Sequence, residues 1–178
     1  MRQRGFEVIQ DYAEAGINLP QRATKQAAGY DIEAGETVRI PSFWQGAIRY
    51  VLAKWPEFKG KDWGEVKEEI MKPTLVPTGL KAYMGADEYL QLTCRSSNPL
   101  KRYLTLPNGI GIIDSDYYNN AGNEGHIYVQ LLNFGLRDVT VKKGERIAQG
   151  IFLPFLKVDQ DQGDQASDRQ GGFGSSGQ

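Results

Sequence analysis

Short apolar segments separated by polar turns make up most of the chain after residue 74, and this pattern constrains the fold more than any other feature. The segments at 75–81, 89–93 and 125–133 alternate apolar with polar residues, and 139–141 and 146–155 add two more. Alternation with a period of two gives a strand one face toward a core and one toward solvent. Many short strands at even spacing, joined by polar turns, are typical of an all-β sandwich or jelly roll.

Two earlier segments extend the strand pattern. Residues 6–9 predict an opening strand, and residues 27–32 read Ala-Ala-Gly-Tyr-Asp-Ile. The small residues of the second segment would let its backbone approach another backbone or a ligand closely. This segment is therefore either a strand with a glycine bend or part of a binding site that includes Asp31.

The stretch 108–117 combines a turn, a strand and a group of polar side chains. The Asn-Gly dipeptide at 108–109 predicts a tight hairpin turn, because both central residues of such a turn favour positive φ. The run 110–113 predicts a short buried strand, and Asp-Ser-Asp-Tyr at 114–117 ends it as a solvated turn or as binding groups. A calcium loop is excluded, because it needs Asp or Asn followed by Gly where 118–119 read Tyr-Asn.

Between residues 41 and 73 the pattern changes from strands to helices. Ser42 has the spacing of an N-cap, and apolar residues repeat at helical spacing until Pro56 stops the run. Asp62 begins a second such run, which Pro73 ends. All three tryptophans lie in this segment. We predict a helical hairpin that packs its aromatic faces against the sheets or a neighbour; the alternative is a partner-docking surface.

Residues 158–178 consist almost entirely of Asp, Gln, Gly and Ser, with Phe173 as the only aromatic residue and Arg169 as the only base. Such a composition cannot form a core. We therefore predict one domain at 1–157 followed by a flexible arm. The segment 171–177 lacks the Lys of a Walker loop, but its amides and hydroxyls beside one ring suit a segment that closes over a ligand.

Charge and composition exclude several classes of function. The 178 residues carry 21 Lys and Arg against 22 Asp and Glu, a net charge of -1, which argues against a nucleic-acid-binding surface. A single cysteine, Cys94, excludes an internal disulfide and a cysteine-rich metal site, and it fits a reducing cytoplasm. The N-terminus lacks a long apolar run, so we expect neither a signal peptide nor a membrane span. The only histidine, His126, is expected to be a partly exposed strand residue rather than a catalytic base.

Five motifs in a fixed order resemble those of the trimeric dUTP pyrophosphatases, or dUTPases. They are Ala-Ala-Gly-Tyr-Asp-Ile at 27–32, Arg-Ser-Ser at 95–97, Gly-Ile-Ile-Asp-Ser-Asp-Tyr at 111–117, Gly-Glu-Arg-Ile-Ala-Gln at 144–149, and Arg169 with Gly-Gly-Phe-Gly-Ser-Ser-Gly at 171–177. The resemblance implies a distorted jelly-roll β-barrel that assembles as a homotrimer. The helical hairpin at 41–73 would be an insertion into that barrel.

The resemblance also implies an activity, the Mg²⁺-dependent hydrolysis of dUTP to dUMP and pyrophosphate. This reaction limits uracil in DNA and supplies dUMP for dTTP synthesis. The resemblance assigns Asp114 to activation of the water that attacks the α-phosphorus. It places Tyr117 against the deoxyribose. The uracil edge would contact the Asn108 side chain and the main chain of Gly111, Ile112 and Ile113.

The phosphates are assigned, again by resemblance, to Arg95, Ser96 and Ser97, whose guanidinium and hydroxyl groups donate to phosphate oxygens. Gln149 would lie near the α-phosphate. The arm, arriving from a neighbouring subunit, would complete each shared site with Arg169 on the terminal phosphate, Phe173 over the uracil, and Ser175 and Ser176 around the phosphates. Phosphate oxygens and water would supply most of the Mg²⁺ ligands. Asp31 and Gln149 would contact those ligands rather than the ion itself.

Two features depart from the family, and two other functions stay open. The spacing from Arg169 to Phe173 is one residue shorter than in many members. The polar loop at 118–124 stands where many members turn at once on a Gly. This loop leaves open whether Tyr128 lies beside the base. One alternative is a dCTP deaminase, a group that shares the fold but lacks the Phe-Gly-Ser arm. The other is a regulatory protein on this scaffold that binds a partner through the insertion at 41–73.

Overall fold

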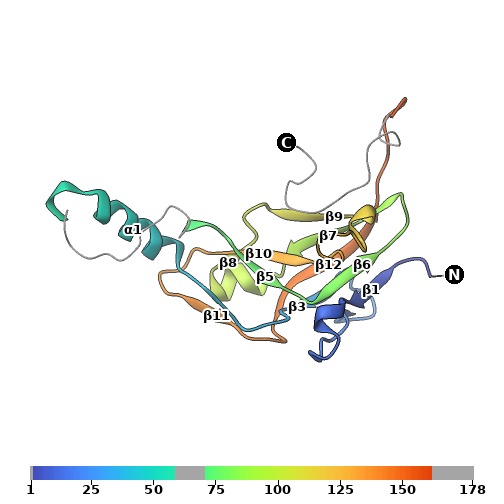
Figure 1. Ribbon diagram of the computed structural model, residues 1–178, viewed down its shortest axis with the longest axis horizontal. Helices are drawn as coiled ribbons and strands as arrows, with labels where there is room; N and C mark the ends of the chain where they lie inside the picture. Colours follow the sequence, from blue (N-terminus) through green and yellow to red (C-terminus); the bar gives the residue numbers. More distant parts are fainter. Residues whose placement is uncertain (1, 59–70, 162–178) are drawn as a thin grey trace.

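The computed structural model describes residues 2–58 and 71–161 and is mostly β (Figure 1). The strands are β1 (Gly5–Val8), β2 (Gln21–Arg22), β3 (Tyr30–Glu33), β4 (Val38–Ile40), β5 (Thr74–Pro77), β6 (Leu80–Tyr83), β7 (Glu88–Cys94), β8 (Leu104–Thr105), β9 (Ile110–Asp114), β10 (Tyr128–Asn133), β11 (Val139–Val141) and β12 (Arg146–Pro154). The helical elements are α1 (Phe43–Lys54), the 3-10 turns η1 (Gln10–Tyr12), η2 (Pro56–Phe58) and η5 (Ser115–Tyr117), and the π-helical turn η4 (Asn98–Arg102). The second helix predicted from Asp62 and the arm after residue 161 lie outside the described residues.

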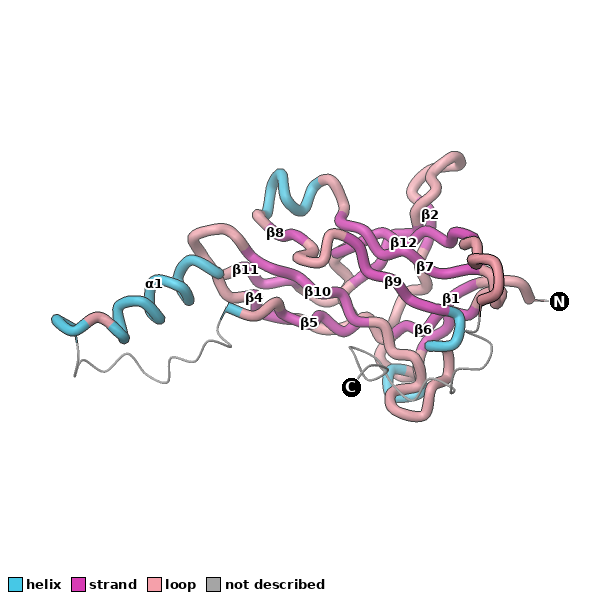
Figure 2. Tube along the Cα trace, turned by 90° about the horizontal axis from the view of Figure 1, so that it is seen from above, coloured by secondary structure: helices cyan, strands magenta, loops and turns pink. Residues whose placement is uncertain are grey.

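Antiparallel pairing joins the described strands into four small sheets. The largest has the strand order β2-β3-β12-β7-β9, and β10 lies between β5 and β8 in a three-stranded sheet. Two further pairs, β1 with β6 and β11 with β4, complete the set. Figure 2 shows these sheets in one elongated body, with α1 extending from the end that β4 and β11 form. The predicted mostly-β fold is confirmed, but within the described residues the sheets do not merge into the closed barrel that the resemblance implies.

The core is formed by alternate residues of these strands. In β10, Val129, Leu131 and Asn133 are buried and the residues between them are partly exposed, as a period of two predicts. The largest fully buried apolar side chains are Ile32, Ile40, Leu80, Leu90, Leu104, Ile127, Leu131, Ile147, Val76, Val129 and Val141. None of the helices in the described ranges has the length and apolarity to cross a membrane.

The strand predicted at 75–81 is divided in two by Thr78 and Gly79. Gly79 has a φ of +72°, which a glycine adopts without steric cost. The Thr78 hydroxyl donates to Ile127 O at 2.6 Å and accepts from Leu80 N at 3.1 Å. The chain changes sheets here, so β5 pairs with β10 and β6 pairs with β1. The other predicted strands are confirmed, with small changes at their ends, as β1, β3, β7, β9, β10, β11 and β12.

The helix α1 begins and ends where the sequence predicts. Ser42 Oγ accepts a hydrogen bond from Gln45 N at 3.2 Å, and the helix ends just before Pro56. The reciprocal half of the capping box does not form. Instead the Gln45 amide donates to Leu136 O at 2.8 Å, and Ser42 N donates to Asp138 Oδ1 at 2.8 Å. Tertiary contacts have therefore replaced a local one.

One face of α1 carries large apolar side chains that the described residues leave partly uncovered. Trp44, Ile48, Val51 and Trp55 recur at helical spacing, and their exposed fractions lie between 48% and 54%. Figure 1 shows α1 directed away from the sheets. The first helix of the predicted hairpin is thus present, but its apolar face does not pack against the sheets.

Asn133 fixes the base of α1 to the end of β10. This residue is fully buried, and its amide donates to Ile40 O at 3.1 Å and to Arg137 O at 2.8 Å. Its oxygen accepts from Gly135 N at 2.9 Å, and Ser42 Oγ donates to Gly135 O at 2.6 Å. One side chain therefore satisfies three main-chain groups beside the helix N-terminus.

Replacing this amide should weaken the fold. In Asn133→Ala the three main-chain groups lose their partner, and each buried group left unpaired costs about 1–3 kcal/mol. We expect the free energy of unfolding in urea to fall by at least that amount. Asn18→Ala is the matched control because Asn18 is exposed and makes one side-chain bond, to Glu33. Equal losses in the two variants would contradict the role assigned to Asn133.

The only histidine does not lie where the sequence predicts. His126 precedes β10 rather than belonging to a strand, and only 4% of it is exposed. Its Nε2 accepts a hydrogen bond from Gly79 N at 3.0 Å, which requires the neutral ring. Its ring packs between Tyr12 and Tyr128, with centroid distances of 5.2 and 4.1 Å. The prediction of a partly exposed strand residue is wrong, because a contact with a distant turn buries the side chain.

Burial should make this histidine a source of acid sensitivity. It lowers the pKa of the imidazole below its ordinary value of 6.5, although Glu36, Asp11 and Glu124 oppose the shift. Between the lowered pKa and 6.5 the unfolded chain binds more protons than the folded chain. The free energy of unfolding should therefore decrease as the pH falls through this window.

The variant His126→Gln separates this effect from other titrations. Its amide oxygen can still accept from Gly79 N, but it does not titrate. We expect urea midpoints of the wild-type chain to fall between pH 7 and 5, and those of the variant to change less. The carboxyls with lowered pKa values, such as Glu88 and Asp138, titrate at lower pH. The same slope in both proteins would exclude His126 as the cause.

Candidate functional site

A tight turn leads into β9, but it is not a hairpin turn. Gly109 N donates to Leu106 O at 3.0 Å, which closes a four-residue turn with Pro107 and Asn108 in its centre. Gly109 has a φ of +73°, whereas Asn108 keeps a negative φ. Proline favours the first central position of such a turn. The strands on either side pair elsewhere, β8 with β10 and β9 with β7, so the predicted turn is confirmed and the predicted hairpin is wrong.

β9 is an edge strand, and this position explains why it is not the buried strand that the sequence predicts. Its register on β7 pairs Gly111 with Leu92 and Ile113 with Leu90. Ile113 packs against the core, whereas Ile110 and Ile112 are 44% and 48% exposed. Only alternate residues of an edge strand reach the core, so an apolar run there need not be buried. The exposed side of β9 is consequently available to a ligand.

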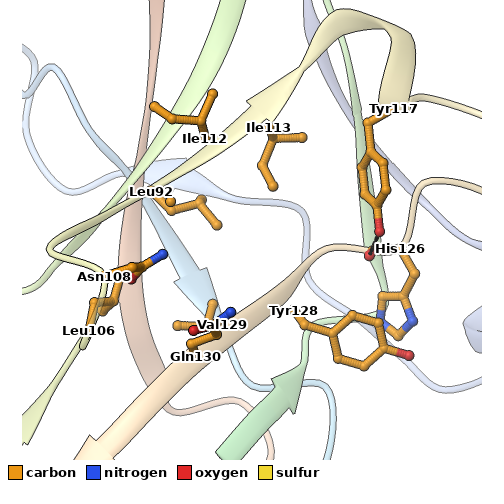
Figure 3. A pocket seen from close by; sticks show the side chains of 11 residues that line it. Leu92, Leu106, Asn108, Ile112, Ile113, Tyr117, His126, Tyr128, Val129 and Gln130 are labelled. Carbon is orange, nitrogen blue, oxygen red and sulfur yellow. Dashed lines mark hydrogen bonds between the residues drawn. The ribbon is translucent and has the colours of Figure 1, made fainter. Parts of the chain in front are cut away.

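A pocket of about 200 Å³ lies beside β9 (Figure 3). It brings together predicted residues from both ends of the 108–117 stretch, and Figure 3 shows Asn108 and Tyr117 on opposite sides of it. The full lining consists of Leu92, Leu106, Asn108, Gly111, Ile112, Ile113, Tyr117, His126, Tyr128, Val129 and Gln130. Apolar walls with a few polar groups suit a small, flat, partly polar ligand.

Several pocket residues come from the start of β10, and the sequence prediction missed most of them. The sequence leaves the place of Tyr128 open and predicts that His126 is not a catalytic base, and it gives no role to Gln130. Tyr128 and Gln130 are partly exposed and alternate with the buried Val129. The period of two that identified the strand therefore also places both side chains on one face. Nothing local in the sequence joins that face to β9.

Asp114 is the last residue of β9 and is partly buried. The 3-10 turn η5 follows at once and reverses the chain, so that Tyr117 returns to the pocket and is only 5% exposed. The carboxylate thus lies one residue beyond Ile113, which lines the pocket. Asp116, in contrast, is exposed.

The motifs at 27–32, 95–97 and 144–149 meet in a second cluster. Asp31 forms an ion pair with Arg95, whose Nε lies 2.9 Å from Oδ1, and accepts a hydrogen bond from Arg146 NH1 at 3.0 Å. Asp31 also pairs in register with Gln149 across β3 and β12. A Cβ added to Gly29 would lie 2.7 Å from Gln149 Oε1, so the glycine allows the close approach predicted for this segment. Asp31 therefore anchors two guanidinium groups.

Beside this cluster lies an open, largely basic hollow. Its lining includes Arg95 and Ser97, both predicted to bind phosphate, together with Lys101, Arg102 and Arg146. Ser96, which lies between Arg95 and Ser97 in the sequence, is exposed. The pocket beside β9 and this hollow share no lining residue. One chain therefore carries the two groups of predicted residues at different places. Arg169, Phe173, Ser175 and Ser176 lie outside the described residues.

Metal ligands are sparse in the same regions. Among residues 2–58 and 71–161, no group of three or more His, Cys, Asp or Glu side chains is arranged to hold a metal ion. Asp31 has two arginine partners instead. The described residues thus do not fit a metal held in a cage of protein ligands.

Comparisons with known proteins identify the family. A family model described as dUTPase matches residues 64–177. The deoxyuridine 5'-triphosphate nucleotidohydrolase of Lactococcus lactis is 48% identical over 177 residues, 99% of either chain. That of Dinoroseobacter shibae is 34% identical over 176 residues, covering 97% of this chain and 96% of the relative.

Solved structures point the same way. The crystal structure of the dUTPase from Streptococcus mutans has a TM-score of 0.68 and 42% identity, and the match covers 87% of this chain and 98% of that one. The dUTPase from phage phi11 of S. aureus shares the fold, with a TM-score of 0.61 at 16% identity over 90% of this chain and 96% of its own. From the five motifs, the pocket beside β9 and these matches, we conclude that the chain belongs to the dUTPase family.

Proposed function

We propose that this chain hydrolyses dUTP to dUMP and pyrophosphate, and that Asp114 activates the water that attacks the α-phosphorus. The observation that carries the proposal is the pocket beside β9, with a carboxylate at the end of the strand that forms its wall. A base bound along β9 would direct its sugar and phosphates toward Tyr117 and Asp114. General-base assistance of this kind is worth roughly 100- to 10,000-fold in rate.

Uracil would be read by the edge of β9. Among the described strands, β9 pairs only with β7, so main-chain groups on its other side, at Gly111 to Ile113, can pair with a base. The Asn108 amide adds a side-chain partner from the turn. Cytosine presents a donor where uracil presents an acceptor, and a buried polar group left unpaired costs about 1–3 kcal/mol. The ring of Tyr117 would lie against the deoxyribose and exclude a 2'-hydroxyl.

The triphosphate would be held by groups that one chain does not bring to its own pocket. We propose a homotrimer of jelly-roll subunits in which Arg95, Ser96, Ser97 and Gln149 of one subunit face the pocket of another. The separation of the pocket from the basic hollow supports this assembly, because a triphosphate bound in one must reach the other. We also propose that residues 1–157 form the domain and that residues 158–178 form an arm that closes over the site. The single cysteine fits a location in a reducing cytoplasm.

Magnesium would enter as part of the substrate complex. Mg²⁺ on nucleotides is commonly held by phosphate oxygens and water with few protein ligands, which fits the scarcity of carboxylate clusters among the described residues. The ion would supply charge neutralisation along the phosphates. Asp31 would act through Arg95, which it orients, rather than through the metal.

A second candidate function, partner binding through the insertion, has one observation in its favour. The apolar face of α1 is about half exposed, and the charged residues of this helix, Arg49 and Lys54, are both basic. A protein partner with apolar anchors and acidic neighbours would fit it. Ile48→Asp should abolish binding of such a partner while dUTP turnover stays unchanged. Loss of turnover, or retained binding, would contradict a separate docking surface.

Asp114→Asn tests the mechanism. We expect kcat to fall by roughly 100- to 10,000-fold, because the amide cannot take a proton from water. Binding of a non-hydrolysable dUTP analogue, followed by calorimetry, should change little. Product analysis with dUTP and dCTP excludes the deaminase alternative if only dUTP is consumed, to dUMP and pyrophosphate. Asp116→Asn is the matched control, since this exposed neighbour should retain activity.

Deleting residues 169–178 tests the arm. We expect most of the activity to be lost, because Arg169, Phe173, Ser175 and Ser176 are removed together. The melting temperature and the trimeric mass should not change, since a segment of this composition adds nothing to the core. A truncated protein that melts early would mean that the arm is structural. One that keeps full activity would mean that the arm takes no part in catalysis.

A further inference from the structure

We propose that Asn123 is a positioning residue that fixes the ring of Tyr117 in the pocket and thereby contributes to discrimination between dUTP and UTP. The inference rests on the proposed function, in which Tyr117 lies against the deoxyribose. It assigns a role to the polar loop 118–124, which departs from the usual family pattern.

The Tyr117 hydroxyl is held by two hydrogen bonds. It donates to His126 O at 3.0 Å and accepts from Asn123 Nδ2 at 2.7 Å. Figure 3 shows the tyrosine directed across the pocket with its hydroxyl at the His126 main chain. Because only 5% of Tyr117 is exposed, water has little access to either hydrogen bond. The two bonds fix both the depth and the direction of the ring.

Asn123 is itself held in place by its neighbours in the loop. Asn120 Nδ2 donates to Asn123 Oδ1 at 2.8 Å and to Tyr117 O at 2.9 Å, and Asn120 Oδ1 accepts from Asn123 N at 3.1 Å. Gly125 N donates to Asn123 Oδ1 at 3.2 Å. These bonds close a compact turn around the backbone of Tyr117 and hold the amide of Asn123, whose Nδ2 donates to the tyrosine hydroxyl and, at 3.4 Å, to His126 O.

Glycine is required where the loop closes. Gly125 has a φ of +82°, and a Cβ there would lie 2.6 Å from Tyr117 O. Asn119 and Glu124 also have positive φ, 57° and 61°. An L-residue rarely adopts this conformation, so the loop is tightly wound rather than an open excursion.

The far side of the loop is tied to the sheets through Lys81 of β6. Only 8% of this lysine is exposed, and its ammonium group donates to Glu124 Oε1 at 2.5 Å and to Asn119 Oδ1 at 2.7 Å. Glu124 Oε2 also accepts from Gln10 N at 2.8 Å. The loop thus binds Lys81 of β6 through Asn119 and Glu124, which lie near its two ends. It binds Tyr117 through Asn120 and Asn123, which lie between them.

The consequence concerns specificity. A tyrosine that excludes a 2'-hydroxyl by steric contact must keep its position. A displacement of about 1 Å can change a rate roughly 100-fold. A ring that can shift that far would leave room for the 2'-hydroxyl. A side chain that fixes the ring should therefore matter more for the ratio of kcat/KM values for dUTP and UTP than for overall stability.

The test compares this ratio in four variants and the wild type. For Asn123→Ala we expect it to fall roughly 10- to 100-fold, mainly because kcat/KM for UTP rises. Tyr117→Phe keeps the ring but removes the hydroxyl, and it should lower the ratio to a similar extent. The double variant should lose less than the two single losses combined, because both changes break the bond between the Asn123 amide and the Tyr117 hydroxyl. Asn119→Gly is the matched control: it lies in the loop, loses its bond to Lys81, tolerates positive φ, and should keep the wild-type ratio.

Two outcomes would overturn the inference. A further variant, Tyr117→Ala, distinguishes failure of the inference alone from failure of the proposed binding mode. If Asn123→Ala lowers the melting temperature but leaves the ratio unchanged, Asn123 has only a structural role. If Asn119→Gly lowers the ratio as much as Asn123→Ala does, the loop as a whole, and not Asn123, is responsible. Tyr117→Ala should lower the ratio most. If it does not, Tyr117 does not contact the deoxyribose, and the proposed binding mode fails together with the inference.

Discussion

The pairing of β9 with a single neighbour is the constraint on which the rest of the site depends. Its register on β7, with Leu92 opposite Gly111 and Tyr89 opposite Asp114, fixes which side chains turn inward. Since side chains alternate along a strand, a slip of one residue would turn Ile113 out of the core. The same pairing leaves the other edge of β9 beside the pocket. One set of ladder hydrogen bonds therefore sets the pocket wall and the position of the carboxylate that follows it.

The opposite side of the pocket depends on buried polar groups rather than on apolar packing alone. Tyr117, His126 and Tyr128 bring three polar rings together, and the loop after Tyr117 adds buried Asn120. Among the described residues, every buried side-chain nitrogen and oxygen has a hydrogen-bond partner. A network of this kind adds little net stability, but leaving one member unpaired is costly. It therefore favours one arrangement of the rings over its alternatives, which is what recognition of a small base requires.

Sequence reasoning succeeded where the signal is local and failed where the outcome depends on distant pairing. The N-cap at Ser42, the stop at Pro56 and the turn before Gly109 each need only a few neighbouring residues, and all three are present. The exposure of Ile112 and the burial of His126 depend on sheet order and on Gly79, far along the chain, and both predictions were wrong. The family motifs supplied the candidate site residues. Their partners, such as Arg146 for Asp31, needed the structure.

The basic hollow shows why the charge of the whole chain says little about a phosphate site. The chain has a net charge of -1, yet the hollow is lined by four cations, Arg95, Lys101, Arg102 and Arg146, and one anion, Glu145. Counting the adjoining Asp31, four positive charges against two negative charges leave a local charge of +2. Asp31 pairs with two arginines and Glu145 with a third, at 2.8–3.0 Å, so these carboxylates orient the guanidinium groups as well as offsetting part of their charge. A triphosphate reaching this hollow would meet cations already held in place, and the entropy of ordering them would not be lost again on binding.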